Sequence, residues 1–379
     1  MIAPLETAAA LLSARAGRAV RLESPELLKS WARNDVWRAR VAGGSSLPAS
    51  VIVKRYKAEP ERGLDEWAAL ALLTTAGLAP VAAPVFLGGD AEARCFVVED
   101  LGEAPTLEDL LNAKGGDARE RAGAALLEVA RLTARLHVAM RPLAAEFDRR
   151  RDELARRALT TVAAAAGALR GRGEDLVAWL SALREPSPEP VDEAIEALVQ
   201  FVERPGPWTT LTHGDMAPSN TARAAGGWRL LDFEYAGLRP ALYDALVWTL
   251  FCPFPPALIE RADRAYRETL AGGFPDARDD GAYGTARARV AAWRMLDLLH
   301  WQPPVLLDAD RAWAPGVGAR GAVLWHLARF HALADAASGD PAVAPIAATT
   351  RALERALCAR WGRPPDAGAV WPAFRADRL

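Results

Sequence analysis

The chain has little cysteine and little lysine, and its charges nearly balance. Only three of its 379 residues are cysteine, far apart along the chain, so neither a disulfide framework nor a zinc ribbon is expected. The 46 basic residues stand against 48 acidic ones, which argues against a nucleic-acid-binding protein and gives no electrostatic reason to expect a membrane surface. Four of the basic residues are lysine, so lysine is an unusual choice wherever arginine would serve.

Long apolar runs are also missing. No stretch of about 20 apolar residues lacks charges, so no transmembrane helix is predicted. The first 18 residues have no basic segment before their short apolar run and carry Glu6, which favours an amphipathic helix over a signal peptide. With 51% hydrophobic and 25% charged residues, we expect a globular cytoplasmic protein with neither a membrane nor a nucleic-acid partner.

The first hundred residues have strand character, and the remainder is mostly helical. Short β-branched runs predict four strands, at residues 36–41, 51–56, 85–87 and 95–98. Apolar residues at helical spacing predict a helix over 62–76, between the second strand and the third. We therefore expect an α+β fold with two lobes, a small β-rich lobe at 1–102 and a large helical lobe at 103–379.

The strongest local signal is a histidine-glycine-aspartate triplet at His213–Asp215, followed by Asn220 and, twelve residues later, Asp232. Phosphoryl transfer needs one carboxylate to orient the attacking hydroxyl and accept its proton. It needs a second carboxylate and an amide oxygen to hold Mg²⁺ against the phosphates. Asp215 fits the first role, and Asn220 with Asp232 fits the second. No cluster of histidine and cysteine competes as a metal site.

A lysine to bind the nucleotide phosphates is also expected in such a site. Lys54 lies in the predicted strand 51–56, and the predicted helix follows it. Glu66 lies in that helix, where it could pair with Lys54 and hold it in place. Each of these residues alone is a weak signal; their order and spacing together indicate phosphoryl transfer.

At this point the chain resembles the aminoglycoside phosphotransferase and choline kinase family, small-molecule kinases with a protein-kinase-like, two-lobed fold. The resemblance covers roughly Asn34 to Phe251 and is carried by VIVK, EWAALALL, VVEDLG, LTARLH, LTHGDMAPSN and LLDFEYAG. It implies ATP or GTP as co-substrate in the cleft between the lobes, Mg²⁺ as cofactor and a small-molecule hydroxyl as acceptor. It also implies that the backbone at Glu99, Asp100 and Leu101 binds the adenine, and that His213 supports the catalytic loop.

Several alternatives stay open. No GxGxxG motif separates the first strands; Arg33–Val36 or Gly43–Ser46 could cover the phosphates instead, and the sequence does not identify the residues that do so. Glu234 either touches a metal ion or caps a turn. The acceptor is an aminoglycoside, an amino alcohol such as choline, or a sugar. A nucleotide-binding pseudokinase without catalysis is the alternative of another class, although the complete set of four site residues argues against it. Protein kinase activity is disfavoured because only eleven residues separate Asp232 from Asp244, too few for an activation segment.

Two features of the helical region bear on the acceptor. Four tryptophans could form an aromatic cage for a quaternary ammonium group, although core packing is the more common role: Trp293, Trp301, Trp313 and Trp325. Three aspartates could supply the carboxylates that a polycation requires: Asp297, Asp308 and Asp310. The histidine of LTARLH, His137, is expected to be a structural helix residue.

Overall fold

The computed structural model describes residues 3–43, 46–155, 161–188, 190–314, 317–363 and 370–375. The chain forms two compact units that interleave along the sequence. Unit 1 comprises Met1–Leu107, Leu143–Leu159 and His213–Gly237, and unit 2 comprises Glu108–Pro142, Thr160–Thr212 and Leu238–Leu379. The segment with the HGD triplet, Asn220 and Asp232 therefore belongs to the same unit as the N-terminal strands.

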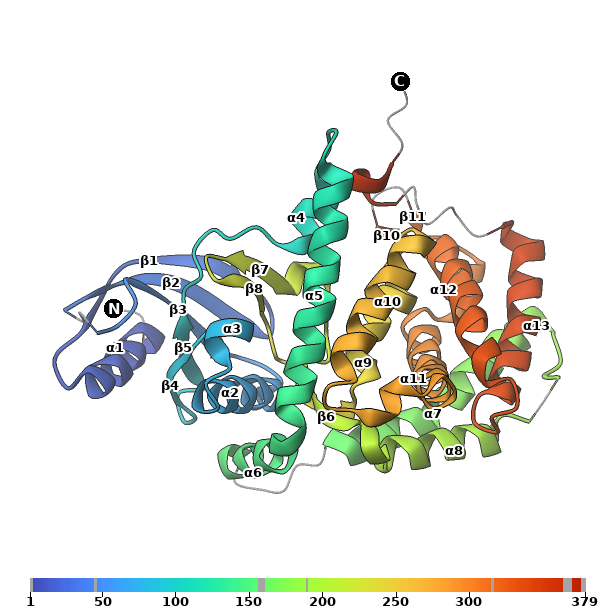
Figure 1. Ribbon diagram of the computed structural model, residues 1–379, viewed down its shortest axis with the longest axis horizontal. Helices are drawn as coiled ribbons and strands as arrows, with labels where there is room; N and C mark the ends of the chain where they lie inside the picture. Colours follow the sequence, from blue (N-terminus) through green and yellow to red (C-terminus); the bar gives the residue numbers. More distant parts are fainter. Residues whose placement is uncertain are drawn as a thin grey trace. The chain divides into compact units, whose positions relative to one another are not determined.

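A five-stranded antiparallel sheet organises unit 1, in the order β1-β2-β3-β5-β4 (Figure 1). The strands are β1 (Arg21–Ser30), β2 (Asn34–Ala42), β3 (Ser50–Tyr56), β4 (Phe86–Asp90) and β5 (Cys95–Glu99). All four predicted strands are present. The sequence does not predict β1, because Pro25 and several charged residues interrupt its alternation. As an edge strand, β1 needs hydrogen bonds on one side only and tolerates such residues.

The helices of unit 1 are α1 (Ala3–Ala16), α2 (Pro60–Thr75), α3 (Ala79–Ala82) and α6 (Ala144–Ala155). The predicted N-terminal helix and the helix after the second predicted strand are both present. Leu12 of α1 packs in a buried cluster with Val51 and Val53 of β3, so α1 covers one face of the sheet. Side chains alternate between the two faces along a strand. Lys54 and Tyr56 therefore lie on the face of the sheet opposite to Val51 and Val53.

A short hairpin explains the spacing between Asn220 and Asp232. Its strands are β7 (Thr221–Ala224) and β8 (Gly227–Leu230), with Thr221 opposite Leu230. The chain therefore leaves Asn220, turns back, and returns beside it: the amide of Leu231 donates to the carbonyl oxygen of Asn220 at 2.8 Å. Asn220 and Asp232, twelve positions apart in the sequence, therefore lie at the same end of the hairpin.

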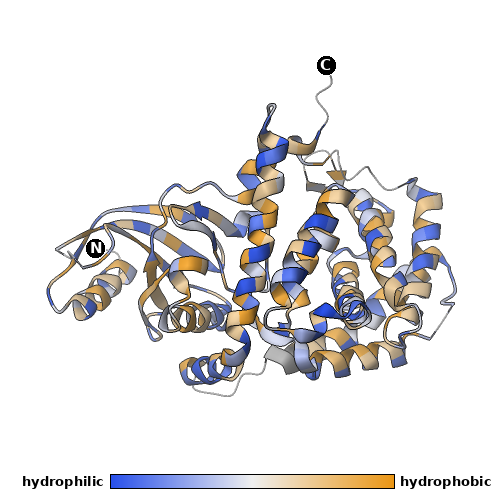
Figure 2. Cartoon of the chain, in the orientation of Figure 1, coloured by the Kyte–Doolittle hydropathy of each residue, from blue (hydrophilic) through white to orange (hydrophobic). Residues whose placement is uncertain are grey.

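Unit 2 is mostly helical. Its helices are α4 (Leu107–Asn112, whose first residue lies in unit 1), α5 (Ala118–Met140), α7 (Thr161–Leu183), α8 (Asp192–Glu203), α9 (Leu242–Leu246), α10 (Pro256–Leu270), α11 (Asp280–Trp301), α12 (Ala319–Ala334) and α13 (Ala344–Trp361). Short strands accompany them: β6 (Thr209–Thr212), β9 (Gly237–Pro240), β10 (Ala312–Ala314) and β11 (Val317–Gly318). Figure 2 shows hydrophilic and hydrophobic residues together along α5 and α10, as expected of amphipathic helices with one buried side. Over the described part of the chain, no helix has both the length and the apolar character needed to cross a membrane.

Candidate active site

A cavity of about 320 Å³ lies within unit 1. Its walls come from four parts of the unit: the strands of the sheet, helix α2, the segment after β5, and the region around the β7–β8 hairpin. The predicted site residues on its lining are Lys54, Glu66, Glu99, Asp100, Leu101, Asn220 and Asp232. The structure thus brings seven of the eight predicted site residues to one cavity. The eighth, Asp215, is not part of the lining but accepts a hydrogen bond from Asn220, which is.

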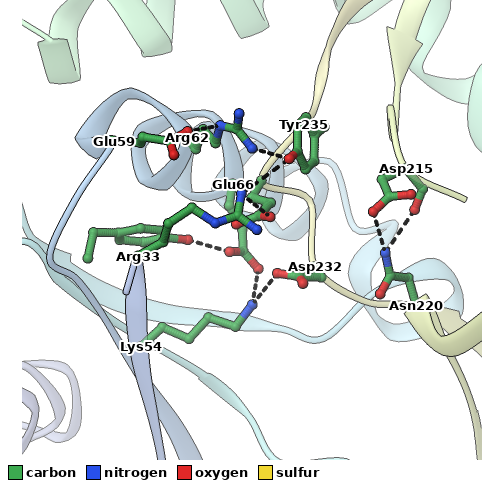
Figure 3. A network of polar contacts seen from close by, with 11 residues as sticks. Arg33, Lys54, Glu59, Arg62, Glu66, Asp215, Asn220, Asp232 and Tyr235 are labelled. Carbon is green, nitrogen blue, oxygen red and sulfur yellow. Dashed lines mark hydrogen bonds and ion pairs between the residues drawn. The ribbon is translucent and has the colours of Figure 1, made fainter. Parts of the chain in front are cut away.

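The ammonium group of Lys54 contacts the carboxylates of both Glu66 and Asp232 (Figure 3). Its Nζ lies 2.5 Å from Oε1 of Glu66 and 3.0 Å from Oδ1 of Asp232. The hydroxyl of Tyr56 donates to the other carboxylate oxygen of Glu66. The predicted pairing of Lys54 with Glu66 is therefore confirmed. Since Lys54 and Tyr56 are two residues apart on β3, they share a face and reach the same carboxylate.

Burial and pairing set the charges of this group. Burial opposes the charge on Lys54, but Glu66 and Asp232 outweigh it and raise the pKa of Lys54 above its ordinary value. The pKa of Glu66 is raised by burial, although the charge of Lys54 opposes this rise. Burial would also raise the pKa of Asp232, yet its pKa is lowered, chiefly by Lys54. A protonated lysine thus keeps Asp232 ionised and suited to a cation.

The backbone around the HGD triplet is held by His213. The amide of Asp215 donates to Nδ1 of His213 at 3.3 Å, and Nε2 of the same ring lies 2.7 Å from the carbonyl oxygen of Leu231. His213 therefore ties the loop to the segment before Asp232, the supporting role that the resemblance implies. Gly214 has φ of +86°, and a Cβ there would collide with the carbonyl oxygen of Tyr235, so only glycine fits.

The side chain of Asn220 holds Asp215 in place. Its Nδ2 donates to the backbone oxygen of Asp215 at 2.9 Å and to that residue's Oδ2 at 3.2 Å. The side-chain nitrogen of Asn220 is thus used in holding Asp215. Its side-chain oxygen, Oδ1, is the type of donor atom that hard cations such as Mg²⁺ prefer. Asp232 has φ of +64°, a left-handed conformation that is uncommon outside glycine and is concentrated at functional sites.

A second cluster of polar residues borders the first and was not predicted as a unit. Arg33, in the turn between β1 and β2, lies 3.1 Å from Oε1 of Glu234 and donates to the hydroxyl of Tyr235 at 3.2 Å. Arg62 of α2 donates to the same hydroxyl, and its guanidinium lies 4.3 Å from the centre of the Tyr235 ring. Glu234 thus has a role outside the two alternatives derived from the sequence: it forms an ion pair with Arg33. No sequence signal marks Arg62 or Tyr235, because their contacts join residues 173 positions apart.

Asp100 fixes the segment that follows β5. Its carboxylate accepts hydrogen bonds from Ser50 Oγ at 2.8 Å, from the Gly102 amide at 2.9 Å and from Arg38 at 3.3 Å. Burial opposes its ionisation, but these donors lower the pKa of Asp100 below its ordinary value. Of the two segments considered for covering phosphates, Arg33–Val36 has Asn34 and Val36 on the cavity wall, and Gly43–Ser46 includes Gly44 and Ser45, which lie outside the described residues.

The aromatic residues of unit 2 already surround a cation of the protein itself. The guanidinium of Arg294 lies 4.3 Å from the Tyr243 ring, 4.7 Å from Phe251 and 5.2 Å from Trp301. Trp293 and Trp325 are buried, as core packing predicts. These contacts argue against a cage of tryptophans for a quaternary ammonium group.

Two of the three candidate carboxylates for a polycation are also engaged. Asp297 lies 3.2 Å from Arg172 and 3.3 Å from Arg294, and Asp310 accepts hydrogen bonds from two backbone amides. His137 pairs at 2.9 Å with Asp244 and with the hydroxyl of Tyr266, all three being buried, which confirms its structural role in the helix.

Comparison with known proteins agrees with this arrangement. The sequence profile of the phosphotransferase enzyme family (APH) matches residues 25–280, about two thirds of the chain. The chain belongs to the phosphotransferase enzyme family. The resemblance seen in the sequence is thereby confirmed. No curated protein matches the chain significantly.

Solved structures of phosphotransferases resemble the chain at low identity. The macrolide 2′-phosphotransferase MphH from Brachybacterium faecium is 20% identical with a TM-score of 0.44, over 81% of this chain and 93% of that one. The choline kinase LicA from Streptococcus pneumoniae, in complex with AMP, is 16% identical with a TM-score of 0.43, over 86% and 97%. Aminoglycoside phosphotransferase APH(4)-Ia is 14% identical with a TM-score of 0.48, over 89% and 99%.

The phosphotransferase has the predicted α+β class, with a five-stranded antiparallel sheet followed by a mostly helical region. In the described residues, no group of three or more His, Cys, Asp and Glu side chains is arranged to hold a metal ion.

Proposed function

We propose that this phosphotransferase transfers the γ-phosphoryl group of ATP or GTP to a hydroxyl group of a small molecule. The observation that carries the proposal is the joint placement of Lys54, Asp232 and Asn220 on one cavity, with Asp215 hydrogen-bonded to Asn220. A lysine for phosphates, oxygen ligands for a hard cation and a carboxylate for the attacking hydroxyl are the groups that this reaction requires.

The nucleotide is proposed to lie in the cavity of unit 1. Glu99–Leu101 would present backbone groups to the base, because the side chain of Asp100 is taken up by Ser50 and Arg38. Lys54 would bind phosphate oxygens while Glu66 and Tyr56 hold its position. LicA is known in complex with AMP, which supports a nucleotide as a ligand.

The donor set also fits Mg²⁺. Asp232 is kept ionised by Lys54, and Asn220 contributes an amide oxygen, both of which suit a hard cation. When held by Asp232 and Asn220, Mg²⁺ would supply positive charge that neutralises the charge developing on the phosphates during transfer.

Asp215 is proposed to orient the acceptor hydroxyl and accept its proton. Its backbone is fixed by His213 and its carboxylate by the amide of Asn220. Catalysis would then rest mainly on position and electrostatics, with little movement of the protein at the moment of transfer.

The acceptor classes carried forward are aminoglycosides, amino alcohols such as choline, and sugars. The names of the similar structures include both antibiotic phosphotransferases and choline kinases, so an experiment must distinguish between the acceptor classes. The engagement of Asp297 by two arginines is an observation against a cation-binding role for that carboxylate.

The test is transfer of label from γ-labelled ATP and GTP to pooled acceptors of each class. Transfer to one pool by the wild type, but not by Asp215→Asn, is the expected result, and that pool gives the acceptor class. Tight nucleotide binding without transfer to any pool or to a metabolite extract would favour the pseudokinase instead.

A further inference from the structure

The edge strand β1 carries an irregularity beside the cavity. Leu27 pairs with Trp37, but Lys29 rather than Leu28 pairs with Val36, so β1 has one extra residue there. In a regular strand, neighbouring side chains point to opposite faces. A bulge redirects a side chain and commonly occurs next to active sites. Here it allows the adjacent residues Leu28 and Lys29 to line the same cavity.

The strand register sets Lys29 in line with Lys54. Lys29 of β1 lies opposite Val36 of β2, and Val36 lies opposite Lys54 of β3. Directly opposite residues share a face of the sheet, and two strand spacings separate the backbones of the two lysines by about 10 Å. All three residues line the cavity. Two of the four lysines in a chain otherwise rich in arginine thus lie in one row facing one cavity.

The two lysines differ in their partners. Lys54 is paired with two carboxylates, which leaves that group of three with one net negative charge. Lys29 has no ion pair with any residue that the structure describes, and its Nζ lies 4.3 Å from the centre of the Trp31 ring. A tryptophan face orients an ammonium group without neutralising it. The charge of Lys29 therefore remains available to an anion.

Lys29 and Asp232 also line the same cavity, as does Lys54 with its two carboxylate partners Glu66 and Asp232. A triphosphate brought beside a group of net negative charge requires further positive charge nearby.

We propose that Lys29, oriented by Trp31, binds the terminal phosphates of the nucleotide and supplies the phosphate contact for which the sequence has no glycine-rich loop. This inference rests on the proposed function, because it assumes a nucleoside triphosphate in the cavity. It assigns the contact to β1 itself, and neither of the two segments considered from the sequence contains Lys29.

The test measures equilibrium binding of Mg-ATP, Mg-GTP and AMP by isothermal titration calorimetry, without an acceptor. Lys29→Gln should weaken binding of the preferred triphosphate about tenfold, as expected for a lost hydrogen bond to a charged group, and leave AMP affinity unchanged. Lys29→Arg should keep most of the triphosphate affinity. Trp31→Leu should weaken it by about threefold, since it removes only the orienting ring.

Lys114→Gln is the matched control, because it removes the same charge at an exposed position of unit 2. Unchanged triphosphate affinity in Lys29→Gln would overturn the inference and leave the proposed function standing. Equal losses for triphosphate and AMP would also overturn it, because they would indicate damage to the sheet edge. If the wild type bound neither triphosphate, the proposed function would fail, and this inference with it.

Discussion

Arg33 and Glu234 form an ion pair of 3.1 Å that joins the turn between β1 and β2 to the segment that carries Asp232. Glu234 is buried, whereas the Arg33 side chain keeps 35% of its surface exposed. Burial, followed by the nearby charge of Asp232, raises the pKa of Glu234, and Arg33 opposes that rise. The pair therefore balances a carboxylate that would otherwise add to the negative charge around Asp232.

This pairing predicts energetic coupling between the two residues. Arg33→Gln and Glu234→Gln should each lower the free energy of unfolding, and the double variant should lose less than the sum, with a coupling of roughly 1 kcal/mol. Urea unfolding of the four proteins measures this cycle. Additive losses would show that the ion pair contributes nothing, and a Glu234→Gln effect confined to the Mg²⁺ dependence of nucleotide binding would assign Glu234 to the metal instead.

Loss of Lys54 should destabilise the protein even without nucleotide. Lys54→Met leaves the buried Glu66 beside Asp232 with no cation between them, which should cost about 3 kcal/mol of unfolding free energy at neutral pH. Unpaired buried carboxylates have raised pKa values in the folded state, so the loss should shrink as the pH falls from 8 to 5. Urea titrations at several pH values check both statements, with Lys114→Gln as the control. A loss independent of pH would contradict this explanation.

Asp215 and Asp232 should differ in what they affect. Asp215→Asn is expected to reduce the transfer rate by about 10²–10⁴ while leaving nucleotide affinity nearly unchanged, because only the proton acceptor is lost. Asp232→Asn is expected to weaken binding of Mg-nucleotide itself, since it removes the ionised carboxylate next to Lys54 that is proposed to bind Mg²⁺. Titration calorimetry alongside transfer kinetics separates these effects. Full turnover in Asp215→Asn would refute the role assigned to that residue.

His326 should make the protein less stable in mild acid. Burial lowers the pKa of His326 to about 4, whereas in the unfolded chain it has its ordinary value. Between these two values the unfolded state binds the extra proton, so stability falls as the pH drops below about 6.5. The part due to this histidine should reach about 2 kcal/mol between pH 7 and pH 5. Comparing wild type with His326→Gln at both pH values isolates that part, and an equal decline in the two proteins would exclude His326 as its source.

The sequence by itself determines much of unit 1 and the set of candidate site residues. Four strands and two helices of that unit follow from alternation and helical spacing, which are local properties. The residues from His213 to Asp232 are recognisable because a loop and a hairpin keep chemically related groups within 20 positions. Lys54 stands out because lysine is rare in this chain, and its partner Glu66 is only twelve residues away.

The tertiary structure alone decides the contacts that cross the unit. The ion pair of Lys54 with Asp232 joins residues 178 positions apart, and the hydrogen bond of Arg33 to Tyr235 joins residues 202 apart. Neither leaves a periodic pattern in the sequence. The bulge at Lys29 is likewise invisible there, because its direction depends on how β1 is registered against β2. Side-chain direction follows from strand pairing, and pairing is fixed by the packing of the whole sheet rather than by any local run of residues.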